Sequence, residues 1–208
     1  MYSCTLYEFI FIVKLSYTFP MHSLILSAHP SPSSFTHAIA QAYREGKESR
    51  GNTALVIDLY DPRWKQEFLC FETHEELSER EKTLTPLQEE VKKADEIVFV
   101  FPVWWYDVPA ILKNFIDCNL TSGFAFKFMP KGYLRGLLKP RTVRYFATAM
   151  GPTFMYKYHI LPFAPAFRKS VKDCGLKTTS KTIFGFMGTS DQAKREGWLN
   201  EVRKSATG

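Results

Sequence analysis

The chain has 208 residues, of which 45% are hydrophobic and 15% aromatic, which is enough material for one substantial core. Its formal net charge is +6, but the lysines and arginines are scattered and accompany no zinc-finger, homeodomain or RNA-recognition signature, so composition does not favour a nucleic-acid-binding protein. The four cysteines form no CxxC pair and no zinc-ligand spacing, which predicts free thiols in a reducing cytoplasm and no metal site. No apolar run reaches the roughly 20 residues that a membrane span requires.

The first 20 residues form a segment with an apolar centre that Lys14 interrupts. Neither a basic start nor a small-residue cleavage site marks them as a secretory signal. We expect a single folded domain over residues 21–208, because no repeat, low-complexity tract or linker divides it. Residues 1–20 are then an extension or a misassigned start, and the rival interpretation is an added edge element or a dimer contact.

A short apolar run at residues 23–28 (SLILSA) predicts the first strand, and a hydroxyl-rich turn follows it at His29–Ser34 before a helix. Free backbone N–H groups and the positive end of the helix meet at such a turn, so it can bind an anion. Ordinary N-capping by one of the serines explains the same residues. His29 stands at a strand end. No comparable setting is expected for His22, His37 and His74.

A second strand is expected at residues 53–59 (TALVIDL), followed by a long polar excursion over residues 60–85 that includes a helical part. The glutamate run at residues 75–81 reads as a solvated helix face, not a metal site. A further helix at residues 85–94 leads to the continuous apolar run 97–101 (IVFVF). Such a run predicts a strand that is buried on both faces, in the middle of a parallel sheet.

Pro102 ends this run, and the loop after it carries Trp104, Trp105 and Tyr106. Packing explains any one of these aromatic side chains, but three in succession cannot all enter one core. At least one is therefore expected to line a surface or a ligand cleft. A helix is predicted from Pro109 onwards. Its inner side is expected to consist of Ala110, Ile111, Leu112, Phe115 and Ile116.

The rest of the chain continues the alternation of strands and helices. After a loop rich in Lys, Gly and Pro at residues 127–140, strands are predicted at residues 142–149 and 178–186, and helices at residues 163–174 and 190–204. Strands separated by helices are typical of an α/β fold with a doubly wound parallel sheet.

Three segments resemble the flavodoxin-like NAD(P)H:quinone oxidoreductase family: HPSPSSF at His29–Phe35, FPVWWYDVPAILKNFID at Phe101–Asp117, and GFAF at Gly123–Phe126. The resemblance extends more loosely over residues 21–188. It implies a flavodoxin-like three-layer sandwich with a five-stranded parallel sheet, a bound flavin (FMN or FAD), NAD(P)H as co-substrate and a homodimer. The implied activity is that of an NAD(P)H dehydrogenase (quinone), in which a hydride passes to the flavin and two electrons then reach a quinone or similar acceptor in a ping-pong cycle.

The resemblance also implies which residues serve the flavin, its phosphate in the first loop and its ring in the later ones. The implied cofactor-binding residues are His29, Ser33, Ser34, Phe35, Pro102, Val103, Trp104, Trp105, Tyr106, Thr148 and Gly151. The implied catalytic residues are Tyr156 and His159, with Phe126 and Phe128 as lids. Two departures stand out: the Ala147–Gly151 loop replaces the family's frequent Thr-Thr-Gly-Gly, and the spacing of the Tyr/His pair is shorter.

No hydrolase or nucleotide-binding motif competes with this interpretation, since the sequence lacks GxSxG, HExxH, Walker and Rossmann GxGxxG patterns. Two alternatives remain. One is a flavin-binding regulatory or electron-carrier module without turnover, and the other is a flavin-free interaction protein, which the altered Ala147–Gly151 loop allows. Bound flavin and turnover of NAD(P)H with a quinone distinguish the three.

Overall fold

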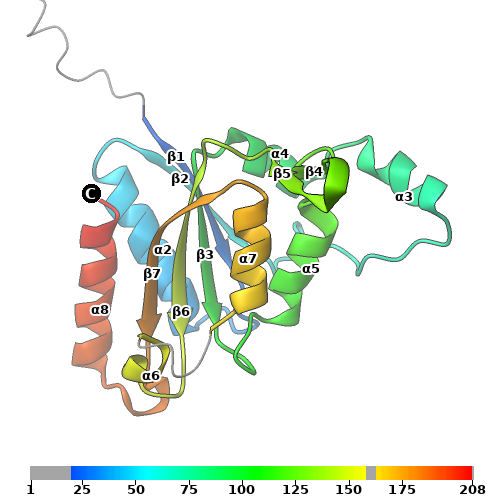
Figure 1. The fold of residues 1–208 in the computed structure, drawn as a ribbon. Coiled ribbons are helices and arrows are strands. Elements are labelled where there is room, and N and C mark those ends of the chain that lie inside the picture. Colours follow the sequence, from blue (N-terminus) through cyan, green and yellow to red (C-terminus); the bar gives the residue numbers. More distant parts are fainter. Residues whose placement is uncertain (1–19, 158–162, 208) are drawn as a thin grey trace, which may run out of the picture.

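The computed structural model describes residues 20–157 and 163–207 (Figure 1). Residues 1–19 of the expected extension, and His159, lie outside this part. Five parallel strands form one sheet in the order β2-β1-β3-β6-β7. Their bounds are β1 (His22–Ser27), β2 (Thr53–Asp58), β3 (Glu96–Pro102), β6 (Thr142–Thr148) and β7 (Lys177–Phe184). The five-stranded parallel sheet expected from the sequence is thereby confirmed.

Helices cover both faces of this sheet, which gives the three-layer architecture. One face carries α2 (Phe35–Glu48) and α8 (Gln192–Ser205). The other face carries α4 (Pro86–Lys93), α5 (Ala110–Asn119) and α7 (Pro165–Asp173). Shorter helical elements are α6 (Thr153–Lys157) and the 3-10 turns η1 (Pro130–Gly132) and η2 (Met187–Thr189). No helix of the described ranges has the length and hydropathy of a membrane span.

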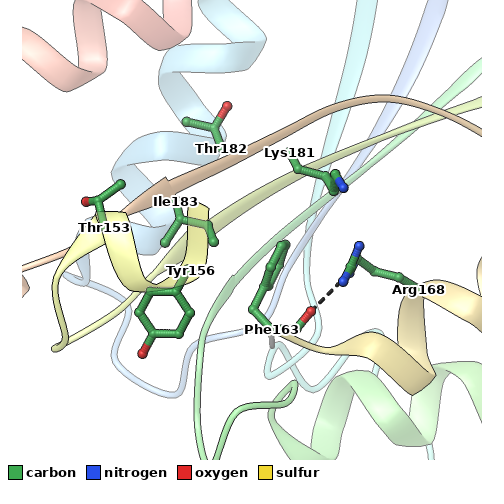
Figure 2. A pocket seen from close by; sticks show the side chains of 7 residues that line it. All are labelled: Thr153, Tyr156, Phe163, Arg168, Lys181, Thr182 and Ile183. Atoms are coloured by element: carbon green, nitrogen blue, oxygen red, sulfur yellow. Dashed lines mark hydrogen bonds between the residues drawn. The ribbon is translucent and has the colours of Figure 1, made fainter. Parts of the chain in front are cut away.

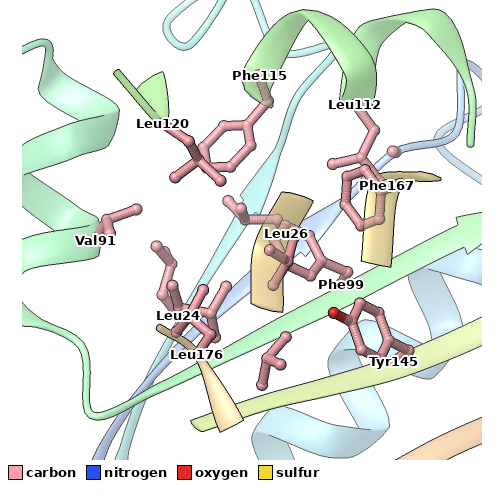
Figure 3. Packing of buried hydrophobic residues seen from close by; sticks show 14 of the residues in the cluster. Leu24, Leu26, Val91, Phe99, Leu112, Phe115, Leu120, Tyr145, Phe167 and Leu176 are labelled. Atoms are coloured by element: carbon pink, nitrogen blue, oxygen red, sulfur yellow. The ribbon is translucent and has the colours of Figure 1, made fainter. Parts of the chain in front are cut away.

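The central strand β3 is buried at every position, as its continuous apolar sequence predicts. Phe99 shows why: its ring packs against Phe115 of α5, Tyr145 of β6 and Phe167 of α7 (Figure 3). Aromatic side chains of this size each remove a large apolar area from water, so this layer supplies much of the driving force for folding. This core also fixes the position of the carboxyl end of β3 next to those of β1 and β6.

The excursion after β2 contains α3 (His74–Glu81), which buries no residue and lies to one side of the sheet in Figure 1. Its acidic face is solvated, as expected. The excursion crosses α5, where Asn114 donates to the carbonyl oxygen of Gln66 at 3.0 Å and Asn119 donates to the Gln66 side chain at 2.6 Å. Both asparagines are buried, whereas Ala110, expected on the inner side, is exposed. The prediction for Ala110 was wrong: it is the first residue of α5, and the helix buries Leu112, Asn114 and Phe115 in its first two turns instead.

The segment after GFAF was expected to be a loop but forms an antiparallel hairpin of β4 (Phe126–Phe128) and β5 (Leu134–Gly136). Its short strands leave several apolar side chains in solvent, including Phe128 and Tyr133, which are 69% and 68% exposed. Each strand has three residues, too few for the alternation of polar and apolar side chains to reveal it in the sequence.

Candidate functional site

The loop between β1 and α2 closes on the N-terminus of the helix. The N–H of Ser34 donates to the Ser31 carbonyl oxygen at 3.1 Å, and the Ser34 hydroxyl accepts the N–H of His37 at 3.3 Å, which makes Ser34 the N-cap. The N–H groups of Phe35 and Thr36 belong to the first turn and have no acceptor within the helix. They are therefore free to bind an anion at the positive end of α2.

Two histidines fix the shape of this loop. The Nδ1 of His29 accepts the N–H of Ser31 at 3.0 Å, and the His29 carbonyl oxygen accepts from His37 Nε2, also at 3.0 Å. His37 Nδ1 lies 2.9 Å from the Ser27 hydroxyl. His37 was expected to have no special setting, and this was wrong, because one helical turn brings its ring back to the end of β1. Burial lowers the pKa of His29, which favours the neutral imidazole.

The loop after β3 is a tight two-residue turn. Trp104 and Asp107 exchange two backbone hydrogen bonds of 3.0 Å, with Trp105 and Tyr106 between them at φ values of +51° and +64°. This is the pattern of a type I′ turn, which usually has Asn or Gly at these positions. A left-handed conformation in a bulky residue costs on the order of 1 kcal/mol or more. The turn leaves the Trp105 side chain 90% exposed.

Three loops meet at the carboxyl end of the sheet. The rings of His29 and Trp104 lie with their centroids 6.2 Å apart, which joins the loops after β1 and β3. Thr148, at the end of β6, accepts the N–H of Val103 at 2.8 Å, and its hydroxyl lies 3.5 Å from that of Thr36. These loops enclose a cleft of about 190 Å³. It is lined by His29, Ser34, Phe35, Thr36, Pro102, Val103, Trp104, Thr148, Ala149, Met150 and Met187.

Most of the cofactor-binding residues expected from the sequence line this cleft, and the others are placed around it. Ser33 lines a more open pocket of about 460 Å³ on the β2 side of the loop. Trp105 and Tyr106 form the exposed turn beside the cleft. Gly151 does not line the cleft, and a Cβ added to it would come within 3.3 Å of the Tyr156 hydroxyl oxygen. Tyr156 itself lines another pocket, between α6, α7 and β7 (Figure 2).

Sequence reasoning missed Thr36, Ala149, Met150 and Met187 among the residues that line the cleft. Thr36 follows the predicted first loop directly, and Ala149 and Met150 follow Thr148, so adjacency could have signalled all three. Met187 carries no such signal. It reaches the cleft only because the chain turns back after β7, where the Met187 N–H donates to the Ala149 carbonyl oxygen at 3.1 Å.

The composition of the cleft fits a phosphorylated aromatic cofactor. The free N–H groups of Phe35 and Thr36 suit a phosphate, and Trp104 offers an aromatic wall for a planar ring. None of the described residues that line the cleft is acidic, so no carboxylate opposes an anion there. The described part of the chain holds no group of three or more His, Cys, Asp or Glu that could bind a metal ion.

Comparison with known proteins agrees with this geometry. A family model described as a flavodoxin-like fold matches residues 21–206. Human ribosyldihydronicotinamide dehydrogenase (quinone) is 29% identical over 203 residues, covering 85% of this chain and 86% of the relative. An uncharacterized NAD(P)H oxidoreductase of Haemophilus influenzae is 36% identical over 143 residues, or 66% of this chain and 68% of the relative.

A similar structure has also been solved, that of an NAD(P)H:quinone oxidoreductase from Methanothermobacter marburgensis. It superposes with a TM-score of 0.72 at 26% identity, over 90% of this chain and 98% of that one. The family model matches residues 21–206, a range that includes the β1, β3 and β6 loops that build the cleft. The chain therefore belongs to the flavodoxin-like NAD(P)H:quinone oxidoreductase family.

Proposed function

We propose that this protein is a flavin-dependent NAD(P)H oxidoreductase that reduces quinones or similar acceptors by two-electron, ping-pong hydride transfer. The observation that carries this proposal is the contact between His29 and Trp104, which unites an anion-binding helix terminus with an aromatic loop. The names of the relatives, a quinone-linked dehydrogenase and an NAD(P)H oxidoreductase, support the substrate classes.

A bound flavin supplies the hydride chemistry, so the residues of this chain have to hold it, orient it and admit two substrates in turn. The N–H groups of Phe35 and Thr36, together with the positive end of α2, hold the phosphate. The backbone of the Trp104–Asp107 turn and the Trp104 ring position the planar ring. We assign His29 to the shape of the loop and not to neutralising the phosphate charge. Its lowered pKa favours the neutral imidazole, and its Nδ1 already accepts the Ser31 N–H.

Tyr156 is the residue of the described chain that we assign to the acceptor. Burial, with Tyr106 nearby, raises the pKa of its phenol, so it stays protonated at neutral pH and can donate a hydrogen bond to developing negative charge. Its hydroxyl lies beside Gly151, at the edge of the loop that bounds the cleft. Gly151, Ser33, Trp105 and Tyr106 keep their assignment as flavin neighbours in this proposal.

We also propose that two copies of the chain pair as a homodimer. The β4–β5 hairpin exposes Phe128 and Tyr133, and Trp105 projects from its turn, which leaves apolar side chains that a second copy can cover. Light scattering on the native protein measures the mass of the assembly, and a Phe128→Lys variant that stays paired would argue against this interface.

The thiols of Cys70, Cys118 and Cys174 are free, which supports a reducing cytoplasm as the place of function.

The decisive experiment is to purify the full chain, release any flavin and identify it as FMN or FAD. The oxidation of NADH and of NADPH is then followed at several quinone concentrations. Turnover with parallel double-reciprocal lines is expected. A yellow protein without turnover would point to an electron carrier or regulator, and a protein that stays colourless with added flavin would point to an interaction protein.

A further inference from the structure

His37 lies in the first turn of α2, directly after the loop that is proposed to bind the flavin phosphate. It is not among the residues that line the cleft, but it lines the open pocket on the β2 side of this loop. Its side chain is only 13% exposed. A largely buried imidazole needs hydrogen-bond partners, so its contacts show what it holds in place.

A closed circuit of hydrogen bonds runs through this loop. His37 Nε2 lies 3.0 Å from the His29 carbonyl oxygen, and the His37 N–H donates to the Ser34 hydroxyl at 3.3 Å. The Ser34 N–H donates to the Ser31 carbonyl oxygen at 3.1 Å. The Ser31 N–H donates to His29 Nδ1 at 3.0 Å, which returns the circuit to the residue where it began. Loss of the His37 imidazole opens this circuit.

The same imidazole connects the circuit to two strands of the sheet. Its Nδ1 lies 2.9 Å from the Ser27 hydroxyl at the end of β1, and its Nε2 lies 3.6 Å from the Asp58 carboxylate at the end of β2. Ser27 and Asp58 are register partners in the parallel pairing of these strands. The imidazole is thus held against two adjacent strand ends, and it couples the position of the loop to the sheet.

The surroundings decide which ring nitrogen of His37 carries the proton. Nε2 faces two groups that can only accept, the His29 carbonyl oxygen and the Asp58 carboxylate. The Ser27 hydroxyl beside Nδ1 can both donate and accept. Nε2 is therefore the donor to the His29 carbonyl oxygen, and the Asp58 carboxylate favours this arrangement.

Ser27, His37 and Asp58 have the residue types of a hydrolytic triad, but their arrangement does not support one. The Ser27 side chain is fully buried, so its hydroxyl cannot reach a substrate. These contacts instead suit a residue that orients other groups, as a precise ligand-binding loop requires.

We propose that His37 is a positioning residue of the flavin site, which holds the loop after β1 so that the N–H groups of Phe35 and Thr36 point at the flavin phosphate. This inference rests on the proposed flavin site and adds to it a residue outside the cleft. A loop that is already held in its binding shape loses less conformational entropy when the phosphate binds. Loss of the imidazole should therefore weaken the binding of phosphorylated flavins in particular.

The test compares His37→Asn with His37→Gln in the full chain. The Gln amide nitrogen is separated from Cα by as many bonds as the Nε2 of histidine, so it can still donate to the His29 carbonyl oxygen, whereas the shorter Asn cannot. Fluorescence titration of the flavin-free protein with FMN and with FAD should show about tenfold weaker binding in His37→Asn. His37→Gln should keep most of the native affinity. Riboflavin, which has no phosphate, should bind both variants and the native chain alike.

His22→Asn is the matched control. The Nδ1 of His22 lies 2.9 Å from the Thr53 hydroxyl, at the opposite end of β1. Its replacement removes a similar contact far from the loop, so it should leave the affinity for FMN and FAD unchanged.

Asp58→Asn gives a second, independent test. The Asn side-chain oxygen can still accept the Tyr60 N–H, which Asp58 accepts at 2.9 Å, so the turn after β2 stays intact. By charge alone, removing a carboxylate near an anion site strengthens phosphate binding. We expect the opposite, about threefold weaker binding of FMN, because Nε2 loses the partner that favours its role as donor. This variant decides the outcome if His37→Asn does not fold.

Several results would overturn this inference and leave the flavin site standing. They are native affinity for FMN and FAD in His37→Asn, equal weakening of riboflavin binding, and tighter FMN binding in Asp58→Asn. Equal weakening in His22→Asn would do the same, since it would show a general loss of structure. A native chain that binds no flavin would overturn the proposed function and this inference together.

Discussion

The indole of Trp104 lies against the imidazole of His29, with the ring centroids 6.2 Å apart and the ring planes inclined by 59°. These residues follow β1 and β3, which pair in parallel from Ser23 opposite Glu96 to Ser27 opposite Val100. Parallel pairing puts both carboxyl ends at one edge of the sheet, where ligands of such folds bind. The contact therefore results from strand register and not from either loop alone.

Ser34→Ala should weaken flavin binding about tenfold and lower the free energy of unfolding by about 1 kcal/mol, because the Ser34 hydroxyl caps the first turn of α2, whose N–H groups are proposed to hold the phosphate. Flavin fluorescence titration and urea denaturation measure the two effects. Thr85→Ala is the matched control, since Thr85 caps α4 away from the cleft. It should lose at least as much stability, because the Thr85 hydroxyl also donates to the Asn119 side chain at 2.5 Å, and it should keep its flavin affinity. Full flavin affinity in Ser34→Ala would refute the phosphate assignment.

Trp105→Asn should raise the free energy of unfolding by roughly 0.5–1 kcal/mol, because Asn tolerates the left-handed conformation that strains a bulky residue. Little packing is lost, since the indole is 90% exposed. Urea denaturation of the flavin-free protein measures the gain. Trp105→Phe keeps the strain and should leave stability unchanged. A loss of stability in the Asn variant would show that the indole makes contacts that stabilise the turn.

Glu96→Gln should lower the free energy of unfolding by about 3–5 kcal/mol, since it leaves buried cations without a counter-charge. The Glu96 carboxylate lies 3.0 Å from the Lys47 amino group and 3.5 Å from Arg144 Nε, and accepts from the Tyr43 hydroxyl at 2.9 Å. Glu90→Gln breaks the Lys93 ion pair on the exposed side of α4 and should cost about 0–1 kcal/mol. Equal losses in the two variants would contradict this reasoning.

Stability should fall steeply above about pH 9, in part because burial raises the pKa of the Cys174 thiol from 9.0 to about 12. Below pH 9 the thiol is protonated in both states. Between pH 9 and 12 the thiol ionises only in the unfolded chain, which lowers the free energy of unfolding by about 1.4 kcal/mol per pH unit. The free energy of unfolding, measured by urea denaturation, should fall between about pH 8 and about pH 10.5 in the native protein. In Cys174→Ala this fall should be about 2 kcal/mol smaller. The exposed Cys70, changed to alanine, should behave like the native chain.

The sequence alone predicted the helices and strands whose signals are local. The run at residues 97–101 is apolar without interruption, and it forms the fully buried β3. Thr85 with Gln88 three positions later forms the capping box of α4, at the boundary expected for that helix. The three loops that line the cleft were also predictable, because each directly follows a predicted strand.

What the tertiary structure decided is which of these local pieces meet. Met187 lines the cleft, and Asn114 and Asn119 are buried, because distant segments supply their neighbours. His37 contacts Ser27 and Asp58 together only through the parallel register of β1 and β2. Hydrophobic periodicity reports which side of an element faces the core, whereas the pairing of elements depends on strand register and crossover connections, which no local pattern encodes.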